Sequence, residues 1–258
     1  MADKQDRVIV EMTIAAPIET VWSTLRDPEQ MLNWFGWDAD TLRDEIQFIF
    51  FDHATADEAS KVVAIEEHEG MADRIELRPA SGGTILRVVR SSAVDDGEWN
   101  AFYEDTWEGW TTFFHQLRFL IERHPGAKRR TLFFSGNRPG NAGDLPVEAL
   151  GLDGLMTAPV GSAVSFDLPV GERASGQVWH RSEHQVGMSV EGWGDGLLVI
   201  TDQPPPNRAP DGGGTAVLTT FGLSDAAFNA LEQRWAAWWA QNFPKRRADT
   251  PSAELAAE

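Results

Sequence analysis

The amino-acid sequence predicts an α+β protein built from two tandem copies of one fold, each an antiparallel sheet wrapped around a long C-terminal helix. Three observations support this prediction. In each half, a run of strand-like segments precedes one long helix-like segment rich in large rings. Glycines and prolines separate the strand-like segments, as turns do in antiparallel sheets. The same order of features occurs twice along the chain, which indicates an internal repeat.

The repeat consists of matching segments in a fixed order. The first copy reads GGTILRVVRSS and later GWTTFFHQLRFLIERHPGAKRR, and the second reads GGTAVLTTFGL and later RWAAWWAQNFPKRR. In this register Trp110 matches Trp235, and Phe114 matches Trp239. Each helix-like segment then meets a proline and ends in Lys-Arg-Arg. The two matching segments are separated by different numbers of residues in the two copies, and loops of different length account for the difference.

The repeat predicts how the chain is divided into domains. We expect a first domain over residues 1–128, a second, divergent and trimmed domain over residues 129–247, and a disordered tail over residues 248–258. A chain of 258 residues has room for one large domain or two of ordinary size. Hydrophobic residues make up 42% of it, which is enough to form a core.

The first copy begins with an alternating strand near residues 7–14. A helix follows, with Pro17 in its first turn and an apolar stripe that includes Trp22. The RDP sequence ends this helix, because a residue before proline disfavours the helical conformation, and a second short helix carries Trp34. Four strands are then expected over EIQFIFF, SKVVAIEEHE, ADRIELRPA and TILRVVRSS.

The helix that closes the first copy has one face of large apolar residues. They recur at spacings of three and four, as on one side of a helix, and comprise Tyr103, Trp107, Trp110, Phe114, Leu117 and Ile121. A curved antiparallel sheet around the helix buries such a stripe.

The second copy is predicted in the same order. Its first strand is TLFFSG, and DLPVEALGLDGLM forms one or two short helical turns. Five more strands are expected over SAVSFDL, SGQVWHR, HQVGMSVE, GLLVIT and TAVLTTFG. The closing helix begins after Ser224, whose side chain suits an N-cap.

Two segments resemble a known family. APIETVWSTLRDPEQMLNWFG and EDTWEGWTTFFHQLRFLIE are similar to the opening and the closing helix of the START/Bet v 1-like (SRPBCC) superfamily, and within it of the homologues of the activator of heat-shock-protein-90 ATPase. The resemblance covers roughly residues 7–123, and the internal repeat extends it to the second half. One segment departs from the family: the acidic stretch WDADTLRDEIQFIFFDHATADEAS replaces a glycine-marked strand pair, which is expected to reshape the first cavity or its mouth.

The resemblance implies a helix-grip fold, in which a sheet grips the closing helix and a cavity between them takes a small apolar or amphipathic molecule. Shape and hydrophobic burial by rings are the expected means of binding. The candidate cavity residues of the first domain are Trp34, Phe35, Trp37, Trp107, Trp110 and Phe114, and their second-domain equivalents are Trp235, Trp238 and Trp239.

Two other functions stay open. The family name implies a protein-interaction or chaperone-regulating module with a protein partner, for which two linked copies would allow bivalent binding. A cyclase or hydrolase-like enzyme is the third hypothesis, although no catalytic constellation or cofactor motif is visible and no cofactor is expected.

Composition argues against several partners. The net charge of −18 disfavours nucleic acid, and the chain lacks an apolar run long enough for membrane insertion. The sequence contains no cysteine and begins without a leader-like segment, so a cytoplasmic location is expected.

Two polar patterns have plainer interpretations than a functional site. HRSEH, from His180 to His184, is the only compact His/Glu cluster, but a polar hairpin tip is the favoured interpretation, and no metal site is expected. Arg87 and Arg90, three apart on one strand, point to opposite faces of the sheet. One of them is a candidate to bind a ligand's acid group, but a surface position is favoured for both.

Overall fold

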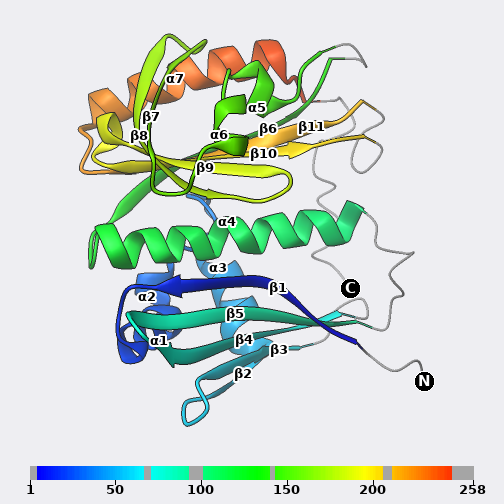
Figure 1. Ribbon diagram of the computed structural model, residues 1–258, viewed down its shortest axis with the longest axis vertical. Coiled ribbons are helices and arrows are strands. Elements are labelled where there is room, and N and C mark those ends of the chain that lie inside the picture. The colour runs from blue at the N-terminus through cyan, green and yellow to red at the C-terminus, as the bar shows by residue number, and fades with distance from the viewer. Residues whose placement is uncertain (1–4, 67–70, 93–100, 140–142, 206–210, 246–258) are drawn as a thin grey trace. The chain divides into compact units, whose positions relative to one another are not determined.

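The structure, a computed structural model, contains two compact units: unit 1, Met1–Thr131, and unit 2, Leu132–Glu258. It describes residues 5–66, 71–92, 101–139, 143–205 and 211–245, and only the backbone of residues 5, 71, 92 and 101–106. The tail predicted over residues 248–258 and the side chain of Tyr103 lie outside the described part. Each unit holds one sheet and one long helix, so the α+β class and the tandem arrangement are confirmed (Figure 1).

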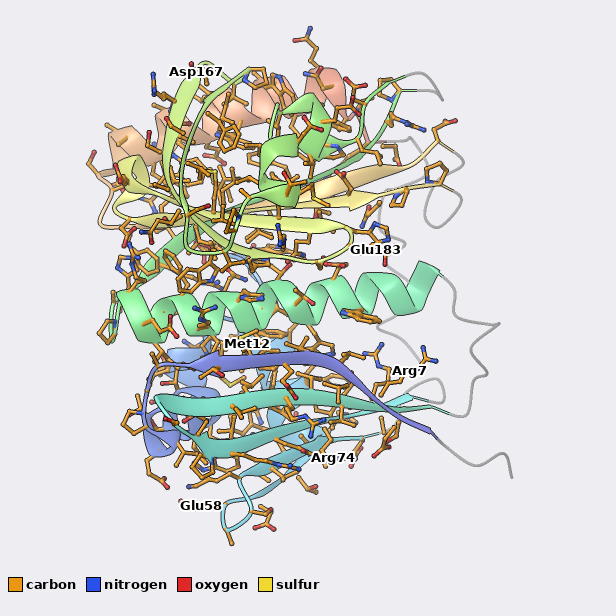
Figure 2. All side chains as sticks on the ribbon, in the orientation of Figure 1. Arg7, Met12, Glu58, Arg74, Asp167 and Glu183 are labelled. Carbon is orange, nitrogen blue, oxygen red and sulfur yellow. The ribbon has the colours of Figure 1, made fainter. Side chains whose placement is uncertain are left out.

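Unit 1 has a five-stranded antiparallel sheet with the strand order β1-β5-β4-β3-β2. Its elements in chain order are β1 (Gln5–Ile14), α1 (Ile18–Arg26), α2 (Pro28–Met31), α3 (Leu42–Gln47), the π-helix η1 (Phe48–Asp52), β2 (Ala54–Asp57), β3 (Val62–Ile65), β4 (Met71–Ala80), β5 (Gly83–Ser92) and α4 (Ala101–Arg123). The long helix α4 lies along the sheet, and Met12 of β1 lies between them (Figure 2).

The expected break between the first two helices of unit 1 is present. Helix α1 ends at Arg26, and the Asp27 side chain accepts a hydrogen bond from the Glu29 backbone N–H at 2.9 Å. Asp27 thereby caps α2, whose first residue is Pro28. The turn after α2 places the Trp34 and Phe35 rings inside the unit.

The prediction of a strand over EIQFIFF was wrong, because this segment forms the end of α3 and the π-helix η1. The buried residues of α3 and η1 are Leu42, Ile46 and Phe50, at intervals of four positions, whereas the Phe48 side chain is 57% exposed. A four-residue period is helical. The richness in β-branched and aromatic residues suggested a strand, but the period along the sequence was the better guide.

Unit 2 has a six-stranded sheet with the strand order β6-β11-β10-β9-β8-β7. Its elements are β6 (Arg129–Asn137, which begins in unit 1), α5 (Pro146–Ala149), α6 (Asp153–Thr157), β7 (Ala163–Leu168), β8 (Glu172–Arg181), β9 (Gln185–Val190), the 3-10 helix η3 (Glu191–Trp193), β10 (Gly196–Gln203), β11 (Gly213–Phe221) and α7 (Asp225–Asn242). The closing helix of unit 2 is shorter than that of unit 1, with 18 residues in α7 against 23 in α4, while the sheet has one strand more.

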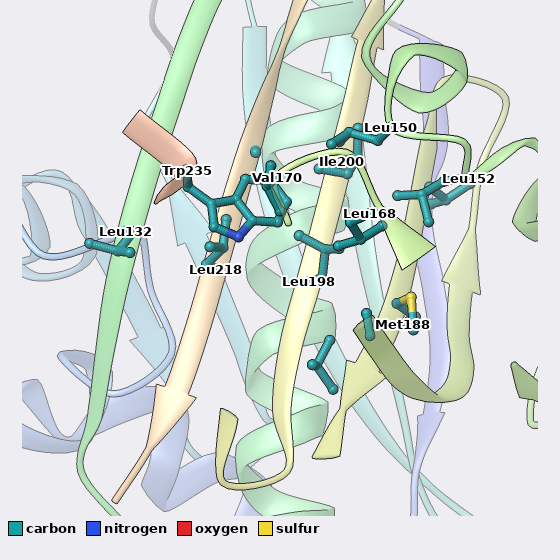
Figure 3. Close-up of a cluster of buried hydrophobic side chains, with 14 of the residues drawn as sticks. Leu132, Leu150, Leu152, Leu168, Val170, Met188, Leu198, Ile200, Leu218 and Trp235 are labelled. Atoms are coloured by element: carbon teal, nitrogen blue, oxygen red, sulfur yellow. The ribbon is translucent and has the colours of Figure 1, made fainter. Parts of the chain in front are cut away.

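The closing helix of unit 2 begins where the sequence predicts. The Ser224 hydroxyl accepts a hydrogen bond from the Ala227 backbone N–H at 3.3 Å, which confirms the N-cap. Trp235 projects from α7 onto the inner face of the sheet, beside Leu132 and Leu218, and forms the centre of an apolar core (Figure 3). Among the described residues, no helix combines the length and apolarity that a membrane span requires.

Candidate functional sites

Four of the predicted cavity residues of unit 1 pack against one another. The Phe114 ring stacks between Trp34, at a centroid distance of 5.7 Å, and Trp110, at 5.4 Å. The Phe35 ring meets Phe50 of η1 edge-on at 5.0 Å. Trp34 and Phe114 are 0% exposed. Since rings in mutual contact gain both burial and stacking energy, this aromatic cluster is a packed part of the core.

The other two predicted residues, Trp37 and Trp107, are half-buried. The Trp37 ring approaches Phe113 at 6.3 Å. Trp107 lies one helical turn before Trp110 on α4. The six residues therefore divide into a packed group and a partly exposed pair.

A buried ion pair lies on the inner face of the unit 1 sheet. The Arg90 guanidinium of β5 donates to both carboxylate oxygens of Asp73 of β4, from Nε to Oδ1 at 2.8 Å and from Nη2 to Oδ2 at 2.7 Å. The Trp110 indole N–H donates to the same Oδ2 at 2.8 Å. Arg90 is 1% exposed, so the surface position favoured for it was wrong.

The neighbours of Arg90 on β5 explain why it is buried. Leu86 and Val88, at two-residue spacing before it, are both 0% exposed, and alternation places Arg90 on their side of the strand. Arg87 lies on the other face, with its Nε 2.9 Å from the Glu11 carboxylate. The alternation in TILRVVRSS is therefore a sequence signal for the inward arginine, whereas its partner Asp73 has no such signal.

Arg129, in the Lys-Arg-Arg run that follows helix α4, is a buried structural residue. Its guanidinium donates to the Leu32 carbonyl at 3.2 Å, to the Gln116 side chain at 2.5 Å, and to the Phe35 and Gly36 carbonyls. Burial lowers the pKa of Arg129 to about 9, which leaves the guanidinium charged at neutral pH. Arg129 therefore holds the turn after α2 against helix α4.

A groove of about 540 Å³ lies beside Arg129 in unit 1. Charged side chains of both signs line it, among them Asp38, Asp40, Arg43 and Lys128. None of the six predicted cavity residues of unit 1 lines it. Its mixed charge is unlike the apolar cavity that the sequence predicts.

The three predicted tryptophans of unit 2 differ in burial. Trp235 is 0% exposed, and its indole N–H lies 3.4 Å from the Glu172 carboxylate, which also accepts from Trp193 at 2.5 Å. In both units, therefore, the matching tryptophan of the closing helix donates to a carboxylate on the sheet. Trp239 is 3% exposed, and Trp238 is half-buried.

A second groove, of about 390 Å³, lies in unit 2 between the edge strand β6 and the end of α7. We call it the β6–α7 groove. Its lining comprises Phe133, Phe134, Ser135, Ala236, Trp239, Ala240, Phe243, Pro244 and Lys245. The Trp239 indole N–H is buried and has no hydrogen-bond partner. Of the predicted unit 2 residues, this groove includes Trp239 alone.

HRSEH forms the hairpin tip between β8 and β9, as the favoured interpretation predicts. His180 is 2% exposed, and its Nε2 lies 2.7 Å from Gln185 Oε1. The Gln185 amide in turn donates to Thr201 at 2.9 Å. The described residues include no group of three or more His, Cys, Asp or Glu side chains that is able to hold a metal ion.

Asp202, next to this hairpin, has a perturbed acidity. Burial raises the pKa of its carboxyl group to about 6, against the opposing effect of the hydrogen bond from the Val147 backbone N–H at 2.9 Å. The pKa of Asp202 in the folded state lies above the ordinary value of 3.8. As the pH rises, the Asp202 carboxyl group therefore loses its proton at a lower pH in the unfolded state than in the folded state. The stability contributed by the protonated carboxyl group is present below about pH 4 and is lost as the pH rises towards 6.

We expect Asp202→Asn to stabilise unit 2 at pH 7.5 by roughly 2–3 kcal/mol and to have little effect at pH 4. Asparagine keeps an oxygen for the Val147 N–H and removes the buried charge. Urea unfolding at both pH values measures the free energy of unfolding. Asp167→Asn is the control, because the Asp167 side chain is 83% exposed. Equal stability of the variant and the parent protein at pH 7.5 would contradict the prediction.

Comparisons with known proteins give structural likenesses only. No protein-family model and no curated protein matches the chain. Among solved structures, protein MLL2253 from Mesorhizobium loti is 22% identical and covers 46% of this chain and 98% of its own, with a TM-score of 0.34. An AHSA1-like protein from Rhizobium etli is 21% identical and covers 49% and 89%, with a TM-score of 0.34. The di-domain ARO/CYC BexL from the BE-7585A biosynthetic pathway is 11% identical and covers 92% and 95%, with a TM-score of 0.35.

Proposed function

We propose that this chain binds a small hydrophobic or amphipathic molecule, and that the β6–α7 groove of unit 2 is where it binds. The observation that carries the proposal is the groove itself. Its volume of about 390 Å³ falls within the range of roughly 300–1,000 Å³ typical of small-molecule sites. Four aromatic rings, two alanines and a proline provide a mostly apolar lining, which favours burial of an apolar ligand.

The polar groups of the groove suggest an amphipathic ligand with a negative head. Lys245 is exposed at the groove and supplies a positive charge in a chain whose net charge is −18. The ligand's chain would then lie along Phe134 and Trp239, whose ring centroids are 6.1 Å apart. No cluster in the described part of the chain favours the protein-interaction or the enzyme hypothesis over this one.

Dodecanoate is a suitable probe, because it combines an apolar chain with a carboxylate. We expect calorimetry to detect saturable binding of one dodecanoate, and Ala240→Trp, which fills the groove, to weaken it at least tenfold. Ala230→Trp is the matched control: Ala230 is an exposed alanine of α7 that does not line the groove. Lys245→Gln is expected to weaken dodecanoate but not 1-dodecanol.

Two results would count against the proposal. One is the absence of binding by both dodecanoate and 1-dodecanol. The other is equal weakening by the Ala240→Trp and Ala230→Trp variants, which would place the ligand elsewhere.

A further inference from the structure

The groove of about 540 Å³ in unit 1 lies between two segments that are far apart in the sequence. One segment runs from Leu32 to Arg43, and the other consists of Lys128 and Arg129, which follow helix α4. None of the six predicted cavity residues of unit 1 lines this groove. It is therefore a different place from the space between the sheet and the closing helix that the family resemblance implies.

Hydrogen bonds hold the two segments together, so the groove is formed before any ligand binds. The Asp38 backbone N–H donates to the Thr131 hydroxyl at 2.5 Å, and the Thr131 backbone N–H donates to Asp38 Oδ2 at 2.8 Å. The Arg129 guanidinium donates to the Leu32 and Gly36 carbonyls of the other segment. Because a preformed site avoids the cost of ordering the chain, this groove is suited to a small ligand.

The buried charge of Arg129 favours a negative group in the groove. Arg129 is 6% exposed, and Asp38 acts on its pKa through charge alone, without a hydrogen bond to the guanidinium. The acceptors of the guanidinium are all neutral groups: the carbonyls of Leu32, Phe35 and Gly36 and the side-chain oxygen of Gln116. These bonds use four of its five N–H groups, so one hydrogen of Nη1 has no acceptor among the described residues.

The other charges of the lining balance that of Arg129. Arg43 is already held by Glu29 through two hydrogen bonds, at 2.6 and 3.3 Å. The remaining lining has two cations and two carboxylates without a hydrogen-bonded ion pair in the described part of the chain: Lys128, Arg129, Asp38 and Asp40. Their charges sum to zero. A ligand with a single charge is therefore repelled by one pair, whereas a ligand with both charges is attracted by both pairs.

We propose that this groove binds a small zwitterion, which carries one ammonium and one carboxylate group joined by an apolar part, as a short peptide does. Lys128 and Arg129 attract the carboxylate. Asp38 and Asp40 accept hydrogen bonds from the ammonium group, which has three to donate. The apolar part of the ligand lies against the apolar side chains of the lining: Leu32, Ala39 and Leu42.

Three forms of one dipeptide test each charge separately: leucyl-leucine, its N-acetyl derivative, which keeps only the carboxylate, and leucyl-leucinamide, which keeps only the ammonium group. We expect calorimetry to detect binding of one leucyl-leucine per chain at neutral pH. Each derivative is expected to bind at least tenfold more weakly, because it loses its attraction to one pair of side chains and keeps the repulsion from the other.

Two substitutions at exposed positions assign the charges of the ligand to the groove. Lys128→Gln is expected to weaken leucyl-leucine about fivefold, as for an exposed pair of charges, and not to weaken leucyl-leucinamide. Asp40→Asn is expected to weaken leucyl-leucine by a similar factor and not to weaken the N-acetyl derivative. A general loss of structure would weaken all three probes together.

The controls make the same changes of charge outside this groove. Asp44→Asn replaces an exposed aspartate of α3, and Lys245→Gln replaces a lysine of the β6–α7 groove. Both are expected to leave the affinity for leucyl-leucine unchanged. Ala240→Trp, which fills the β6–α7 groove, is expected to leave it unchanged as well, so the two proposed sites succeed or fail separately.

The inference is overturned if leucyl-leucine does not bind, or if its two derivatives bind as tightly as leucyl-leucine itself. Equal weakening by Asp40→Asn and Asp44→Asn overturns it too, because the response would then reflect net charge alone. Weakening by Ala240→Trp would place the dipeptide in the β6–α7 groove and would likewise exclude the groove beside Arg129.

Discussion

Replacing Trp34 with alanine is expected to lower the free energy of unfolding of unit 1 by about 3–5 kcal/mol. Trp34 is 0% exposed, stacks on Phe114, and meets Phe35 and Phe50 edge-on. Its indole N–H also donates to the Thr24 carbonyl at 3.1 Å. Alanine leaves a cavity among rings that are held by different elements, and such a cavity closes poorly.

Urea unfolding of the full chain measures this loss. Two units allow two transitions, so hydrogen exchange of α1 and α4 amides assigns the loss to unit 1. Phe48→Ala is the control, because the Phe48 side chain is 57% exposed and contributes little to the core. A loss below about 1 kcal/mol for Trp34→Ala would mean that Trp34 lines an open cavity, as the sequence suggested, and does not fill the core.

Arg129→Met is the second large effect expected, again about 3–5 kcal/mol of unit 1 stability. Methionine keeps much of the apolar stem but removes the guanidinium that donates to the Leu32, Phe35 and Gly36 carbonyls. Buried acceptors without a partner are responsible for most of the cost. The Gln116 Oε1 atom loses the hydrogen bond from Arg129 at the same time, while Gln116 Nε2 still donates to the Gly36 carbonyl at 3.2 Å.

The measurement is thermal and urea unfolding of the Arg129→Met variant beside Arg43→Met. Arg43 lines the groove of about 540 Å³ beside Arg129 and forms an ion pair with Glu29. The Arg43 and Glu29 side chains are 59% and 69% exposed. Exposed pairs contribute little, so this control is expected to leave stability almost unchanged. Similar stability of the two variants would show that Arg129 is not a structural anchor.

The candidate sites divide into features that local sequence reveals and features that it hides. Trp110 and Phe114 were recognisable from the helical period of α4, and Trp239 from the repeat. Arg90 was recognisable in principle, because it shares the alternation of Leu86 and Val88. The interpretation as a surface residue rested on the usual exposure of arginine, which a buried carboxylate partner overrides.

The sequence does not identify the hydrogen-bond partners of the buried arginines. Asp73 is one of 40 acidic residues, and only the β4–β5 register places it opposite Arg90. Arg129 stands in a basic run that is typical of a helix end. Its acceptors lie more than 90 positions away in sequence, and folding alone brings them together.

Outside residues 45–57, the sequence by itself determined the order of the elements, and it also determined the repeat, the N-cap at Ser224 and the break at Asp27. These features depend on periodicity, capping and proline geometry, which act over a few neighbouring residues. Tertiary structure alone decided that the aromatic cluster of unit 1 fills the core, and that a groove opens beside Trp239. The reason is physical: whether rings from distant segments touch or leave space depends on how whole elements pack.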